Sequence, residues 1–191
     1  EHKLNYDTAL EVLAYCKEHK YYAQVYIGDD ILVDKKGKWS DKYSEIIGVP
    51  ITEIGEAVYE IKEAPYKILV MTETEDFQAA WKAFAEKFAG KIVVTSSRDN
   101  FLELMEPGVN KWEAVKAVAE SYNIKPEETM CIGDSNNDLA MIKNAGIGVA
   151  VGNAKDSVKE HAKIVTASNN DDGVAMVVEA ILTQQVTVPE E

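Results

Sequence analysis

The first half of the chain mixes helical and strand-like spacing of its hydrophobic residues. Apolar side chains recur every three or four positions over 7–19 and 75–90, which predicts two amphipathic helices. The segment 38–63, interrupted by Pro50 and Gly55, predicts short helices and loops. Short apolar runs bounded by turn residues predict strands over 22–28, 30–37, 66–72, 91–97 and 101–107. Because these strands come in adjacent pairs, residues 1–106 are expected to form an α+β domain with a mainly antiparallel sheet.

The pattern changes at Pro107 and Gly108, after which single strands alternate with helices. The run 129–134 shows no polar alternation, so it is expected to be a strand buried on both faces. Further strands are expected over 147–154 and 163–166, with helices over 110–123, 137–146, 156–162 and 172–184. This alternation predicts a parallel α/β sheet for residues 107–191, with a frayed tail over 186–191.

Composition excludes several classes of partner. An apolar fraction of 46% is enough for a packed core, and the net charge of -13, spread along the chain, argues against binding to nucleic acid. The apolar runs are too short to cross a bilayer, and no signal peptide is visible, so no membrane partner is expected. Cys16 and Cys131 both lie in apolar segments and are expected to be buried free thiols in a reducing cytoplasm.

The segment "GDSNND", residues 133–138, carries the clearest chemistry. Asp134 follows Gly133 at the carboxyl end of a strand, which is the edge where open α/β sheets bind ligands. A carboxylate there can reach a cation such as Mg²⁺, which takes one or two carboxylates and keeps several waters. Taken alone, Asp138 could equally be a helix-dipole partner, and Asn136 or Asn137 a simple helix cap. Together, between a strand and a helix, these residues favour a site for a metal ion and a phosphate.

Lys111 is the second candidate. It lies in the first turn of the helix that Asn110 is expected to cap, where a cation opposes the helix dipole and costs a little stability. The arrangement is favourable if an anion such as phosphate binds between the ammonium and the helix N-terminus. The alternative is a solvated surface lysine.

Residues 107–182 resemble the C-terminal half of the Cof-type phosphatases of the haloacid dehalogenase superfamily. The resemblance rests on the lysine after "GVN", on "GDSNND", on "AGIGVAVGNA" and on "DDGVA", in that order. Residues 1–106 are similar to the type IIB cap domain of the same family. The resemblance implies an incomplete Rossmann-like parallel α/β core joined to an α+β cap.

The resemblance also implies roles for the candidate residues. Asp134 would ligate a Mg²⁺ ion, and Asp138 would support the metal or its waters. Asn137 would hydrogen-bond the phosphoryl group, and Lys111 would neutralise the phosphate and hold the nucleophile. In the family that nucleophile is the first aspartate of an Asp-x-Asp motif, which forms an aspartyl-phosphate that water then hydrolyses. The substrate would be a small phosphorylated metabolite such as a sugar phosphate.

The sequence departs from the family pattern at the nucleophile, because no Asp-x-Asp follows an apolar strand anywhere in it. We expect the motif to precede Glu1, with at least about 60 further residues, and the chain by itself to be inactive. The open edge of a three-stranded core could also support a homodimer. The alternative function is a non-catalytic fragment that acts as a binding or oligomerisation module.

Overall fold

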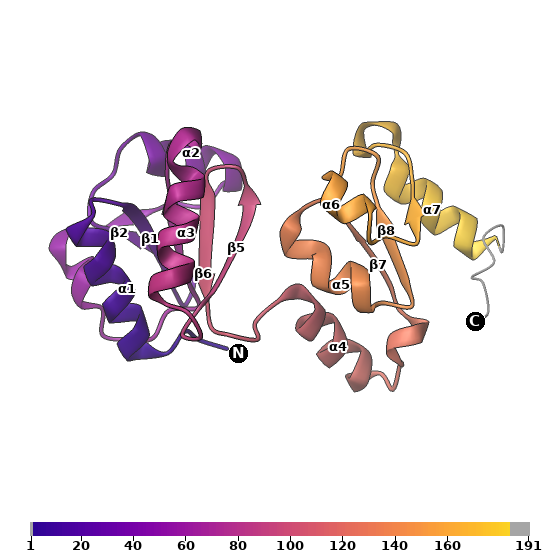
Figure 1. The fold of residues 1–191 in the computed structure, drawn as a ribbon, viewed down its shortest axis with the longest axis horizontal. Coiled ribbons are helices and arrows are strands. Elements are labelled where there is room, and N and C mark those ends of the chain that lie inside the picture. Colours follow the sequence, from indigo (N-terminus) through magenta and orange to yellow (C-terminus); the bar gives the residue numbers. More distant parts are fainter. Residues whose placement is uncertain (1, 184–191) are drawn as a thin grey trace. The chain divides into compact units, whose positions relative to one another are not determined.

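The computed structural model describes residues 2–183 of the chain (Figure 1). The chain forms two compact units, Glu1–Val109 (unit 1) and Asn110–Glu191 (unit 2). The boundary between them follows Val109, whereas the sequence pattern placed the change after Glu106. In the described part of the chain, no helix is long and apolar enough to cross a membrane.

Unit 1 is built on a six-stranded sheet with the strand order β3-β2-β1-β4-β6-β5. All neighbouring strands are antiparallel except β2 and β3, whose parallel pairing was not predicted. Its strands are β1 (Tyr22–Ile27), β2 (Asp30–Val33), β3 (Thr52–Glu53), β4 (Lys67–Met71), β5 (Val93–Arg98) and β6 (Phe101–Met105). Its helices are α1 (Tyr6–Glu18), α2 (Lys38–Ile47) and α3 (Phe77–Lys87), with 3₁₀ turns η1 (Gly55–Glu60) and η2 (Thr74–Asp76).

The core of unit 1 lies between the sheet and the two helices α1 and α3, which run in front of it in Figure 1. The predicted apolar stripes face this core, with Leu13 and Cys16 from α1 and Phe84 from α3 fully buried. The opposite face of the sheet carries Leu69, Met71 and Phe101, against which Trp39 and Tyr43 of α2 pack. The predicted α+β architecture with a mainly antiparallel sheet is therefore confirmed.

Unit 2 contains three parallel strands in the order β7-β8-β9. The strands are β7 (Met130–Gly133), β8 (Ile147–Ala150) and β9 (Ile164–Val165). The helices are α4 (Lys111–Ser121), α5 (Leu139–Asn144), α6 (Asp156–Lys159) and α7 (Gly173–Leu182), with 3₁₀ turns η3 (Pro126–Glu128), η4 (Asn136–Asp138) and η5 (Asn169–Asp171). The predicted parallel α/β arrangement is confirmed; the expected frayed tail lies outside the described residues.

One expectation for unit 2 was wrong. The strand β7 is not buried on both faces, because Cys131 is its only fully buried residue. The other three residues of β7 are partly exposed, and within the described sheet the strand pairs with β8 alone and forms an edge. Both cysteines are buried and free, as predicted.

Candidate functional site

The loops that follow β7, β8 and β9 meet at the carboxyl edge of the parallel sheet. The Asp134 carbonyl accepts a hydrogen bond from the Lys155 N–H at 2.9 Å, which ties the first loop to the second. The Asn153 side-chain oxygen accepts one from the Asn169 N–H at 2.9 Å, which ties the second to the third. Together with α4 and α7 they surround a concavity of about 400 Å³. It is lined by Lys111, Ile132, Gly133, Asp134, Asp138, Met141, Val151, Asn153, Asn169 and Val174.

Asp138 is the anchor of this site. Its side chain is only 4% exposed, and both of its oxygens are used within the protein. Oδ1 accepts a hydrogen bond from the Lys111 ammonium at 2.5 Å. Oδ2 accepts bonds from the N–H groups of Asp134 at 2.9 Å and Ser135 at 3.1 Å. A single buried carboxylate therefore joins the start of α4 to the loop after β7.

The charge of Asp138 is maintained by these donors. Burial alone would raise the pKa of the carboxyl group, because a charge is poorly solvated inside a protein. The hydrogen bonds from Lys111, Asp134 and Ser135, with the positive charge of the lysine, outweigh burial and lower the pKa of Asp138 below its ordinary value. The group is thus a buried anion, with its one charged partner half exposed at 51%.

Gly133 is required by this geometry. A β-carbon at residue 133 would lie 2.5 Å from Cβ of Asp138 and 2.8 Å from its Oδ2, far inside van der Waals contact. Only glycine lets the end of β7 approach the anchoring carboxylate so closely. The glycine before Asp134 thus allows the loop to fold back on Asp138.

Two polar groups near this loop have no hydrogen-bond partner among the described residues, and only the first of them, the Asp134 carboxylate, belongs to a residue that lines the concavity. Asp134 is exposed at the end of β7, and its backbone, but not its carboxylate, is fixed by the contacts above. The Oδ1 atom of Asn137 is buried and has no hydrogen-bond partner among the described residues. A buried amide oxygen without a partner is unfavourable, so its presence beside the loop fits a site that completes its bonding with a ligand or a hydrated cation.

The described residues contain no group of three or more His, Cys, Asp or Glu side chains that could enclose a metal ion. One exposed carboxylate still suits Mg²⁺, which often binds proteins through one or two carboxylates and keeps several waters. The residues of unit 2 therefore fit a partial, open magnesium site centred on Asp134.

The structure brings Lys111, Asp134 and Asp138 together, with Asn137 next to them in η4. Two expectations change. From the sequence, Lys111 was expected to be an unpaired cation at a helix N-terminus. In the structure its ammonium is paired with the Asp138 carboxylate, so removing the lysine should destabilise the fold. Asp138 was expected to hold the metal or its waters; because its oxygens already have three donors, its geometry favours a positioning role. The Asn110 cap is confirmed, since its side chain accepts from the Glu113 N–H at 3.1 Å.

Sequence reasoning assigned no role to Asn153 and Asn169, although both line the concavity. A signal was present, because each residue follows a strand of the parallel sheet and lies in or beside one of the motifs that carried the family resemblance. Because ligands bind at the carboxyl ends of the strands in open α/β sheets, both positions could have been selected from the sequence.

The described fold is thus that of a two-unit protein in which a parallel α/β unit carries a carboxylate-bearing loop at its ligand-binding edge and a second, α+β unit precedes it in the chain. Residues 1–178 match the haloacid dehalogenase-like hydrolase family, and the chain belongs to that family. A crystal structure of a haloacid dehalogenase-like hydrolase from Bacteroides thetaiotaomicron superposes with a TM-score of 0.82 and 29% identity, covering 95% of this chain and 68% of that one.

Curated relatives agree with this assignment. A protein from Haemophilus influenzae is 32% identical over 146 residues, which is 76% of this chain and 54% of the relative. A 5-amino-6-(5-phospho-D-ribitylamino)uracil phosphatase from Bacillus subtilis is 35% identical over 137 residues, which is 71% of this chain and 47% of the relative. The chain thus spans about half the length of these curated relatives.

Proposed function

We propose that the whole protein is a Mg²⁺-dependent phosphatase of small phosphorylated metabolites, and that its nucleophile is supplied from outside these 191 residues. The observation that carries the proposal is the loop anchored by Asp138. This loop presents the Asp134 carboxylate and holds the Lys111 ammonium at the same concavity.

Each residue has a distinct task in this proposal. Lys111 binds the phosphoryl oxygens and offsets their charge, which is the largest electrostatic demand in phosphoryl transfer. Asn137 orients the phosphoryl group, Asp134 holds the cation, and Asp138 positions both Lys111 and the backbone of Asp134. When bound, Mg²⁺ would add further charge neutralisation at the transferring group.

The relatives support the substrate class. The Bacillus subtilis phosphatase is named for a phosphorylated ribityl compound, a sugar-alcohol phosphate. We therefore propose sugar phosphates and related metabolites as substrates. The net charge of -13 argues against nucleic acid as a partner, and a cytoplasmic location and the absence of a membrane partner remain predictions.

The test is phosphate release by the full-length protein on a panel of phosphate monoesters. Asp134→Asn should reduce kcat by at least about a hundredfold, as expected for loss of a metal ligand. Glu120→Gln is the matched control. It also converts an exposed carboxylate to an amide, but on α4 and outside the site, and it should leave kcat unchanged. Full activity of Asp134→Asn, or of the unmodified enzyme in excess chelator, would contradict the metal role.

The 191-residue chain without the remainder of the protein should be inactive, because removing one member of a catalytic unit typically costs several orders of magnitude. The same assay with purified chain tests this. The alternative, a binding or oligomerisation module, is favoured by the free edge of β7, which pairs only with β8 in the described sheet. A homodimer through that edge would appear in light scattering as twice the mass of the chain.

A further inference from the structure

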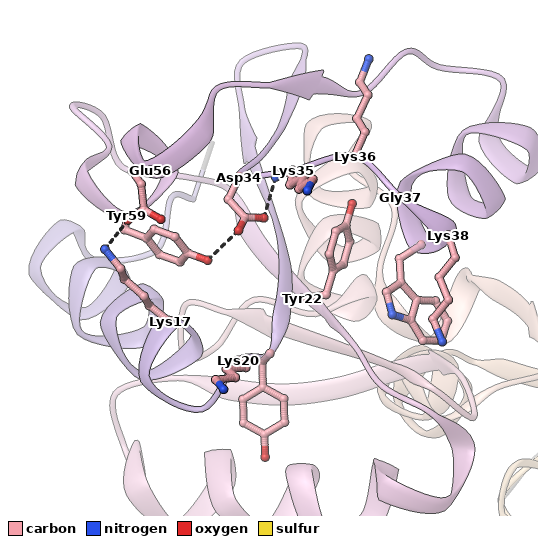
Figure 2. Close-up of a pocket in the computed structure, with 12 residues that line it drawn as sticks. Lys17, Lys20, Tyr22, Asp34, Lys35, Lys36, Gly37, Lys38, Glu56 and Tyr59 are labelled. Carbon is pink, nitrogen blue, oxygen red and sulfur yellow. Dashed lines mark hydrogen bonds and ion pairs between the residues drawn. The ribbon is translucent and has the colours of Figure 1, made fainter.

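Unit 1 contains a second concavity whose lining is strongly basic (Figure 2). Its volume is about 430 Å³, and five of its twelve lining residues are lysines, against two carboxylates. The chain as a whole has the opposite balance, with 20 basic and 33 acidic residues. Such a local excess of positive charge raises the local concentration of anions.

Several of these charges are already paired. Lys17 forms an ion pair with Glu56, and Lys38 forms one with Glu73. The Asp34 carboxylate accepts bonds from the Tyr59 hydroxyl at 3.1 Å and from the Lys35 N–H at 2.6 Å.

Three lysines, Lys20, Lys35 and Lys36, have no carboxylate within ion-pair distance in the described part of the chain. The Lys36 side chain points away from the pocket in Figure 2. Lys20 and Lys35 are therefore the cations left for a ligand in this pocket.

Lysine is an unusual residue for the backbone conformation at position 20. It follows α1 with φ of +58°, in the left-handed region. The Lys20 N–H bonds to the Lys17 carbonyl at 3.3 Å and the Tyr21 N–H to the Cys16 carbonyl at 2.9 Å, which is the helix ending that favours glycine. A cation near the helix C-terminus is favourable, but Lys17 already supplies one in the last turn. Backbone geometry thus gives no reason for a lysine here.

Tyr22 offers an uncharged donor on the Lys35 side of the pocket, away from Lys20 in Figure 2. Its hydroxyl is buried without a hydrogen-bond partner among the described residues, and in Figure 2 it points toward the loop that carries Lys35 and Gly37. A ligand oxygen bound beneath this loop would satisfy it. The Tyr21 and Trp39 side chains add aromatic surface to the lining.

We infer that this pocket binds a small organic phosphate, with Lys35 pairing to the phosphate oxygens, Tyr22 donating a hydrogen bond to them, and Lys20 adding positive charge at the other end of the pocket. An ammonium and a neutral donor at the same end of the pocket match the oxygens of a phosphate group, and the aromatic residues suit the organic part. All lining residues belong to unit 1, and the inference does not depend on the proposed hydrolysis.

The test is an amide-resolved NMR titration of the 191-residue chain, in chelator and low salt, with inorganic phosphate and separately with glucose 6-phosphate. We expect saturable shifts at residues 20–22 and 35–37, with a Kd of about 1 mM or tighter for the sugar phosphate and weaker binding in high salt. Equal affinity for both ligands would support the site but assign it to the phosphate group alone.

Two variants sharpen the test. Lys20→Gly removes the ammonium while placing the residue that the left-handed backbone prefers, so the fold should be kept and affinity should fall about fivefold or more. Lys35→Gln should act similarly. Lys62→Gln, an exposed lysine of unit 1 outside the pocket, makes the same charge change as Lys35→Gln and should leave affinity within about twofold.

The inference and the proposed function fail in distinguishable ways. Shifts confined to residues 111 and 133–138 would support the phosphate site of unit 2 and overturn the one in unit 1. If Lys62→Gln and Lys20→Gly lose affinity equally, the loss reflects only the change in net charge. That result would also overturn the phosphate site in unit 1.

Discussion

Replacing Lys111 by methionine should destabilise unit 2, because it leaves the buried Asp138 carboxylate without its charged partner. Removing one member of a fully buried ion pair costs about 3–5 kcal/mol. Here the lysine is half exposed and Asp138 keeps two backbone hydrogen bonds, so solvent and the remaining donors reduce the loss. We expect about 1–2 kcal/mol, which corresponds to roughly 4–8 °C in Tm per kcal/mol for a domain of this size.

The assay is urea unfolding followed by the indole N–H signal of Trp112, a buried side chain in α4 of unit 2. The other tryptophans, Trp39 and Trp81, lie in unit 1 and report on it separately. Lys116→Met is the matched control, since it removes an exposed lysine from the same helix and should change stability by less than about 0.5 kcal/mol.

A double-mutant cycle with Asp138→Asn completes the test. Asp138→Asn by itself should lower the free energy of unfolding by about 2–3 kcal/mol, because the asparagine amide has no charge and cannot accept all three hydrogen bonds. The double mutant should be more stable than the sum of the single effects by about 1 kcal/mol. If Lys111→Met is neutral or stabilising, or the two effects simply add, the pair does not hold the site together.

Three further outcomes are expected. Gly133→Ala should cost about 2–3 kcal/mol in urea unfolding because its β-carbon would overlap Asp138, whereas Gly37→Ala, with open space around it, should be nearly neutral. Asn137→Ala should leave stability unchanged or raise it by about 1 kcal/mol, since it removes a buried oxygen without a partner, while phosphate binding weakens in the titration above. The lowered pKa of Asp138 contributes stability that is complete above the ordinary value of 3.8 and is lost as pH falls below it, so urea midpoints measured from pH 6 to pH 3 should fall less steeply in Asp138→Asn.

The elements with strong periodicity were predictable from sequence. The stripe on α1, the cap at Asn110 and the position of the 133–138 loop after a strand all depend on neighbouring residues, which the sequence shows directly. The prediction that Lys111 is unpaired was wrong because its partner, Asp138, lies 27 residues away in the sequence. A helix-dipole argument considers only the helix itself, and the contact with Asp138 exists only after β7 and α4 have packed together.

The basic pocket of unit 1 was hidden for the same reason. Lys17 and Lys20 lie at the end of α1, while Lys35 and Lys38 follow β2, and each pair read alone is an ordinary solvated surface. The β1–β2 hairpin brings the two segments together, since Val25 pairs with Leu32 and Ile27 with Asp30. Charge balance along the sequence could not show the local excess, because it averages over the whole chain.

The geometry of unit 2 makes Lys111 a shared cation. Its ammonium has three donor hydrogens, of which one is given to Asp138, and its half exposure leaves the others facing the concavity. A phosphate bound there would take up the free donors without displacing Asp138, provided that the carboxylate keeps its two backbone N–H bonds. The buried anion therefore holds the ammonium in place before the ligand arrives, and the entropy of ordering a long side chain is spent during folding and not during binding. If phosphate binds there as proposed, Asp138 should raise its affinity although it carries the same sign of charge as the ligand, and Asp134 should remain free for the proposed cation.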